Sequence, residues 1–203
     1  MGLLKSIKKR LDWRLNVTFD KATGFYRYKR KKGYIYIRYP RHYLDAKINE
    51  WLCDKLYYHY YMPKNSDTVI DLGTGYGEEA LYLHDKAPNL NFFGVEIQPV
   101  IFECLANTFD SIGSNFKAIS TAINNGESIK LRSQLSYFSV GDDKEDGYID
   151  IPTITWGEFL KKYGIKKVDL LKMNIEGGEK PFLESIEDFS NIKNMIISCH
   201  DFR

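Results

Sequence analysis

The sequence of 203 residues contains no run of about 18 apolar side chains, so we expect no transmembrane helix. Its start lacks the apolar core and the small-residue cleavage site of a signal peptide, and we expect a cytoplasmic protein. The three cysteines, Cys53, Cys104 and Cys199, lie far apart and show no metal-ligand spacing. They are typical of free thiols in a reducing compartment, and no metal site is predicted. Internal repeats and low-complexity segments are also absent, which excludes repeat architectures.

The composition is that of a globular protein, but basic charge is concentrated near the N-terminus. Hydrophobic residues make up 43% of the chain and charged residues 28%. The net charge is only +2, yet the first 50 residues hold 14 of the 29 basic and four of the 27 acidic side chains. Within them, residues 3–15 predict a basic amphipathic helix that could contact an anionic membrane peripherally or pack on the body. The alternative is that the basic N-terminal residues form a solvated, flexible arm.

A β-hairpin and a helix are predicted next. Aromatic-rich strands at Gly24–Arg30 and Tyr34–Tyr39 flank a turn at Lys31–Gly33. A helix from about Leu44 to Tyr61 is expected to end before Pro63, because proline cannot continue a helix.

From residue 66 onward, short apolar strands alternate with helices. Strands are predicted at Thr68–Leu72, Asn91–Ile97, Phe116–Ile123, Val168–Met173 and Asn194–Cys199. Helices are predicted from the glycine-rich segment after the first strand to about Lys86, and at Pro99–Phe109, Trp156–Tyr163 and Glu179–Phe189. Antiparallel strands are predicted within 127–156, around a polar loop at 141–147. We therefore predict an α/β fold with a doubly wound, mostly parallel Rossmann-like sheet at 66–203, preceded by an N-terminal segment at 1–65.

A glycine-rich loop, D-L-G-T-G-Y-G-E-E at 71–79, follows the first strand of this domain. Glycines permit a tight turn and close backbone approach to a ligand, and ligands of such sheets bind beyond the carboxyl ends of the strands. A dinucleotide-binding loop expects glycine at the place of Glu78, and carboxylates at Glu78 and Glu79 would repel a pyrophosphate. S-adenosylmethionine (SAM) has no phosphate, so the loop favours SAM over NAD.

Glu96 ends the second strand, 25 positions after Asp71. A carboxylate there can accept hydrogen bonds from both hydroxyls of a ribose, which SAM and NAD both contain. Glu96 therefore indicates an adenosine ligand without choosing between the two. The alternative interpretation is an exposed glutamate at a strand end.

Three blocks in this order resemble the FkbM family of SAM-dependent methyltransferases over about residues 66–200. They are V-I-D-L-G at 69–73 with Gly75 and Gly77, V-E-I-Q-P at 95–99 with Phe102, Leu105 and Asn107, and T-I-T-W at 153–156 with Phe159 and V-D-L-L-K-M-N-I-E-G-G-E at 168–179. The resemblance implies O-methylation of a hydroxyl on a glycan, glycolipid or other small molecule, often in polysaccharide pathways. With the residue analysis it indicates these cofactor-binding residues: Asp71, Gly73, Thr74, Gly75, Tyr76, Gly77, Glu96, Ile97, Thr121 and Asn174.

Two departures from the family pattern bear on activity. Asn174 replaces the family's aspartate; it keeps hydrogen bonding but cannot act as a carboxylate base or a charged metal ligand. The sequence also ends at Arg203, soon after the fifth predicted strand, so we expect the last two strands of this fold class to be missing. Either the chain is a fragment or another element covers the edge of the sheet.

The candidate catalytic residues are His200, Glu176 and Asn174. Histidine titrates in the physiological range, and the resembling family carries one at the end of this strand, so we hypothesise that His200 takes the acceptor proton. Glu176 would orient His200 or the acceptor. Glu179 is expected to begin a helix and stabilise its macrodipole. The aromatic run Tyr57–Tyr61 could bind a sugar, but core packing is the preferred interpretation.

Two other functions stay open. A degenerate domain that binds SAM, or acts as a scaffold without activity, is motivated by Asn174 and the early end of the sequence. An RNA methyltransferase is motivated by the basic, aromatic first fifty residues. We do not expect nucleic acid as a partner, because the sequence contains neither an RNA-binding signature nor an Asn-Pro-Pro-aromatic motif.

Overall fold

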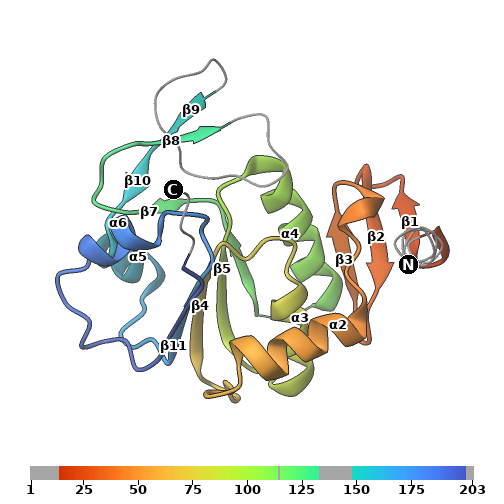
Figure 1. Ribbon diagram of the computed structural model, residues 1–203, viewed down its shortest axis with the longest axis horizontal. Coiled ribbons are helices and arrows are strands. Elements are labelled where there is room, and N and C mark those ends of the chain that lie inside the picture. Colours follow the sequence, from red (N-terminus) through yellow and green to blue (C-terminus); the bar gives the residue numbers. More distant parts are fainter. Residues whose placement is uncertain (1–13, 114, 133–147, 200–203) are drawn as a thin grey trace, which may run out of the picture.

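The computed structural model describes residues 14–113, 115–132 and 148–199, which form an α/β fold around a five-stranded parallel sheet (Figure 1). The strand order is β12-β11-β4-β5-β6. Every neighbouring pair is parallel. The strands span Thr68–Leu72 (β4), Asn91–Val95 (β5), Lys117–Ile119 (β6), Leu170–Met173 (β11) and Met195–Ile197 (β12). The predicted parallel α/β sheet is confirmed, and its arrangement is consistent with a Rossmann-like fold; the absence of two further strands stays a prediction.

Helices cover both faces of this sheet because successive strand residues point to opposite sides. Ile70 of β4 packs toward α5 (Trp156–Tyr163) and α6 (Glu179–Glu184). Val69, its neighbour, packs toward α3 (Glu78–Lys86) and α4 (Pro99–Ile112). The predicted helix at Trp156–Tyr163 has the predicted bounds, since a capping box between Thr155 and Glu158 fixes its start and Gly164 ends it.

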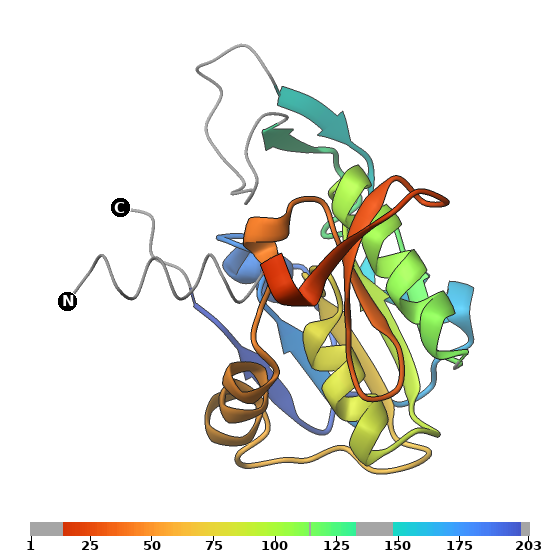
Figure 2. The ribbon, with the colours of Figure 1, turned by 90° about the vertical axis from the view of Figure 1, so that its right-hand side faces the viewer.

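Three antiparallel strands precede the parallel sheet and pack against α4. They are β1 (Val17–Asp20), β2 (Phe25–Lys29) and β3 (Tyr34–Ile37), in the order β1-β2-β3. They lie beside α4 in Figure 1 and in front of it in Figure 2. Tyr28, Ile35 and Ile37 of this small sheet share a hydrophobic cluster with Leu81 of α3 and Cys104 of α4.

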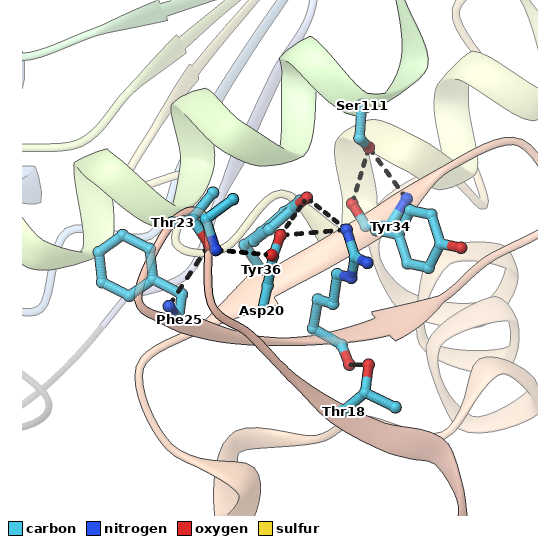
Figure 3. Close-up of polar contacts among 9 residues, drawn as sticks. Thr18, Asp20, Thr23, Phe25, Tyr34, Tyr36 and Ser111 are labelled. Atoms are coloured by element: carbon cyan, nitrogen blue, oxygen red, sulfur yellow. Dashed lines mark hydrogen bonds and ion pairs between the residues drawn. The ribbon is translucent and has the colours of Figure 1, made fainter.

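Side chains of α4 provide hydrogen-bond partners for the backbone of β3. The Ser111 hydroxyl accepts from the Tyr34 N–H (2.9 Å) and lies 3.0 Å from the Tyr34 carbonyl oxygen (Figure 3). The Thr108 hydroxyl accepts from the Tyr36 N–H at 3.0 Å. The outer edge of β3 is thus bound to a helix, which removes an open strand edge.

Three predicted elements differ from the structure. The helix predicted at 44–61 is α2 (Ala46–Leu52), begun by the Asp45 cap, followed by a π-helical turn at Cys53–Tyr57. The strand predicted at 116–123 is wrong as one element: it divides into β6 and β7 (Ala122–Ile123), and β7 pairs with β10 (Thr153–Ile154). The helix predicted at 179–189 ends at Glu184.

Antiparallel strands β8 (Ile129–Arg132) and β9 (Tyr148–Ile151) occur within 127–156, where antiparallel pairing was predicted. The predicted polar loop between them, most of the predicted N-terminal helix and His200 lie outside the described residues. In the described part of the chain, no helix combines the length and apolar character needed to cross a bilayer.

Candidate functional site

A cavity of about 510 Å³ opens beyond the carboxyl ends of β4, β5 and β11. This is the switch point of the sheet, where the chain turns from one side of β4 to the other. Eight of the ten predicted cofactor-binding residues line the cavity: Gly73, Thr74, Gly75, Tyr76, Glu96, Ile97, Thr121 and Asn174. Glu176 lines it as well, while Asp71 and Gly77 do not.

The glycine loop between β4 and α3 needs its glycines for three different reasons. All three have positive φ, 77° at Gly73, 61° at Gly75 and 89° at Gly77. A methyl group at Gly73 would collide with the Asn174 carbonyl oxygen, whereas one at Gly75 would meet nothing within 4 Å. Gly77 instead faces α4, where an added methyl would lie 3.0 Å from Leu105. Gly73 therefore holds the loop against the end of β11, and Gly75 leaves space for a ligand.

Glu96 lies at the end of β5 with its carboxylate turned toward the glycine loop. Its Oε2 accepts from the Gly75 N–H at 3.1 Å, and its Oε1 accepts from the Gln98 N–H at 2.9 Å. Only 9% of the residue is exposed, so the alternative of an exposed strand-end glutamate is wrong. Burial raises the pKa of Glu96 to about 7, although the backbone N–H groups oppose the shift. Each carboxylate oxygen has two lone pairs, so both oxygens can accept a further hydrogen bond.

Asp71 belongs to a buried ion-pair network behind the glycine loop. The Lys172 Nζ lies 2.9 Å from Asp71 Oδ1 and 2.6 Å from Glu79 Oε2, and Lys172 and Asp71 are 2% and 1% exposed. Burial lowers the pKa of Lys172, but the two carboxylates outweigh this effect and raise it, so the ammonium persists. The network joins β4, β11 and α3 at the base of the cavity. Lys172 and Glu79 were not predicted as site residues, although a lysine within an apolar strand signals a buried carboxylate partner.

The loop after β11 presents Asn174 and Glu176 to the cavity. Asn174 Oδ1 is buried and, among the described residues, has no hydrogen-bond partner. Glu176 adopts a left-handed conformation, with φ of 52°. Glu179 is the first residue of α6, as predicted, and its carboxylate accepts from the Ile175 and Gly177 N–H groups at 2.9 Å each. Glu179 thus fixes the loop that carries the two cavity residues.

A wall of the cavity comes from residues 41–44, which sequence reasoning did not assign to the site. His42 is hydrogen-bonded through Nδ1 to the Tyr76 hydroxyl at 2.7 Å. Burial, together with the charges of Arg41 and Arg38, lowers the pKa of His42. The segment lies against the glycine loop because the β1-β2-β3 sheet packs on α3 and α4, and no periodicity reveals such a contact.

The aromatic run Tyr57–Tyr61 does not line the cavity. The Tyr58 ring is buried and stacks on Tyr82, with 6.0 Å between the ring centroids. The Tyr61 hydroxyl donates to Asp67 at 2.7 Å. Packing is therefore the correct interpretation for these two rings, while Tyr60 is 97% exposed.

Comparison with known proteins identifies one family. The methyltransferase FkbM domain matches residues 67–203, about two thirds of the chain. The match contains the glycine loop, Glu96 and the loop after β11. Neither the search of curated proteins nor that of solved structures found a match.

Proposed function

Because the chain belongs to the FkbM methyltransferase family, we propose that it transfers a methyl group from SAM to a hydroxyl of a glycan, glycolipid or other small molecule. One structural observation carries the assignment of the cofactor. Gly73 and Gly75, the buried Glu96 and Asn174, whose Oδ1 has no hydrogen-bond partner among the described residues, surround one cavity at the switch point of the sheet. This is the position at which doubly wound sheets bind adenosine cofactors.

The carboxylate groups around the cavity fit SAM better than a dinucleotide. Glu78, Glu79, Glu96 and Glu176 all line it, and Glu79 is paired with the buried cation Lys172. Such a carboxylate-rich wall would repel a pyrophosphate. It suits the sulfonium and the α-amino group of SAM, both of which are cationic.

We propose a separate role for each of three residues that line the cavity. Glu96 would accept hydrogen bonds from the ribose hydroxyls, since its oxygens retain free lone pairs beside the bonds from Gly75 and Gln98. Asn174 Oδ1 would accept from a donor of the cofactor, which would satisfy a buried acceptor that has no partner in the described part of the chain. Gly75 would let the backbone approach the cofactor closely.

The chain's main catalytic contribution would be alignment. SAM supplies a methyl group that is already activated by its sulfonium, so holding the acceptor hydroxyl in line with it can lower the barrier by about 7–11 kcal/mol. A base that takes the hydroxyl proton would add roughly 10²–10⁴-fold. His200 remains our proposed base, with Glu176 as its orienting partner. A His200→Ala variant with unchanged turnover would remove that role.

Isothermal titration with S-adenosylhomocysteine (SAH) and with NAD tests the cofactor. We expect SAH to bind and NAD not to bind, and Glu96→Ala to weaken SAH binding at least about tenfold, equivalent to one lost charged hydrogen bond. Lys117→Ala is a suitable control, since Lys117 is exposed and does not line the cavity. NAD binding without SAH binding would refute the proposal. SAH binding without methyl transfer to any glycan, glycolipid or small-molecule acceptor would favour the degenerate SAM-binding domain.

A further inference from the structure

Side chains of both charges line the cavity. Its carboxylates lie on the glycine loop, at the end of β5 and after β11, whereas Arg41 and His42 line it from the N-terminal segment. Residues 14–44 carry nine lysines and arginines and a single acidic residue, Asp20. Asp20 is paired with Arg27 in the β1-β2-β3 sheet. The segment that supplies Arg41 to the cavity is therefore strongly basic.

Two arginines of this segment, Arg38 and Arg41, lie beside one aromatic ring. Their guanidinium carbons lie 4.9 Å and 5.0 Å from the centroid of the same ring, Tyr39. Both charges reach His42, because both lower its pKa. Among the described residues neither arginine has a carboxylate partner within ion-pair distance. Guanidiniums without such a partner are available to bind an anion, and Arg41 lines the cavity itself.

On the basis of the proposed function, we propose that the methyl acceptor is an acidic sugar whose carboxylate or phosphate group is bound at the cavity by Arg41, with the charge of Arg38 adding to the attraction. Guanidinium groups match the planar geometry of carboxylates and the oxygens of phosphates. The cationic cofactor would face the carboxylate side, and the anionic acceptor would face the arginine side.

The experiment compares three sugars that differ at one carbon. Full-length protein saturated with SAH is titrated with glucose, glucuronate and glucose 6-phosphate, and the imidazole resonances of His42 are followed by NMR. We expect at least one of the two anions to bind about tenfold or more tightly than glucose, in line with a charge-assisted contact, and to raise the pKa of His42. The better of the two anions identifies the acidic group.

Two variants separate a specific site from general attraction. Arg41→Gln should reduce the preference for the anion to within about threefold of glucose, since the remaining charge is a less direct contact. Lys31→Gln removes the same charge from an exposed position in the turn between β2 and β3 and should leave the preference unchanged.

Several results would overturn the inference. They are equal or undetectable binding of all three sugars, an unchanged preference in Arg41→Gln, and tighter binding of a single-stranded RNA than of either anionic sugar. The proposed function fails separately: absence of SAH binding would refute it, whereas SAH binding without discrimination among the sugars would refute the acceptor class alone.

Discussion

Lys172 shows how one buried residue can support a site from behind. It is the only charged side chain of β11, yet it is almost fully buried between Asp71 and Glu79. Replacing a buried ion pair completely can be neutral, but removing one partner leaves an uncompensated charge in a poorly solvated place. Here removal of the ammonium would leave two carboxylates facing each other behind the glycine loop.

We predict that Lys172→Met lowers the free energy of unfolding by about 3–5 kcal/mol, because Asp71 and Glu79 would lose their shared cation. Urea denaturation followed by circular dichroism measures the change. Lys180→Met is the matched control, since Lys180 forms an exposed pair with Glu184 (83% and 66% exposed). An exposed pair contributes about 0–1 kcal/mol. Similar small losses in both variants would show that the buried network does not stabilise the fold.

The proposed role of Glu96 would make cofactor binding depend on pH. Burial raises its pKa to about 7 in the free protein, and a ribose hydroxyl donates best to the ionised carboxylate. We therefore predict that SAH affinity is full above about pH 7 and falls toward about tenfold per pH unit below it, as one proton must be released on binding. Isothermal titration between about pH 5.5 and 8.5, a range that brackets this pKa, measures the slope.

The Glu96→Gln variant supplies the control for this pH dependence. The amide cannot titrate, so SAH should bind more weakly at high pH and with little pH dependence. The same slope in this variant and in the unaltered protein would assign the titration to another group.

At the scale of elements, local signals in the sequence predict what short-range physics determines. The apolar strands β4 and β5, the helix α5 with its Thr155–Glu158 capping box, and the glycine loop all lie where their patterns indicate. The same patterns placed Glu96 and Asn174 near that loop, because carboxyl ends of parallel strands share one edge of the sheet.

Long-range pairing explains what the sequence does not reveal. Residues 116–123 have the apolar character of one strand, but β7 leaves the main sheet to pair with β10, which is about thirty residues later in the chain. The cavity wall at 41–44 depends on how a separate small sheet packs on α3 and α4. Neither arrangement is encoded in a spacing, so tertiary packing alone decides it.

The contact between β3 and α4 gives a prediction at this scale. Thr108→Val removes the acceptor of the Tyr36 N–H in a buried place, and we expect a loss of about 1–3 kcal/mol in the free energy of unfolding. Thr18→Val is the control: the Thr18 hydroxyl is exposed and contacts the Arg27 carbonyl at 3.4 Å (Figure 3), so its loss should change stability by no more than about 0.5 kcal/mol. Equal effects would mean that the hydroxyl of α4 does not anchor the strand.

At the scale of the whole molecule, the described chain is one packed unit in which the N-terminal sheet supports the helices and the segment beside the cavity. Tyr28 of β2 illustrates the connection: its hydroxyl donates to Glu78 Oε1 at the start of α3, and Glu78 lines the cavity. The division predicted at residue 65 remains a prediction about the sequence, but the hydrophobic cluster of Tyr28, Ile35 and Leu81 crosses it. A change in the small sheet should therefore alter the proposed cofactor site.

Ile35→Ala tests whether the molecule unfolds as this single unit. Ile35 is fully buried, and its truncation should cost about 2–5 kcal/mol. Because β3 packs on the helices that frame the cavity, we expect one cooperative transition, shifted to lower denaturant for both circular dichroism and bound SAH. Ile48→Ala, at a position 53% exposed on α2, should change stability by no more than about 0.5 kcal/mol. If SAH binding persisted through an early loss of the small sheet, the two parts would be independent, and a cavity wall from residues 41–44 would not be needed to hold the cofactor.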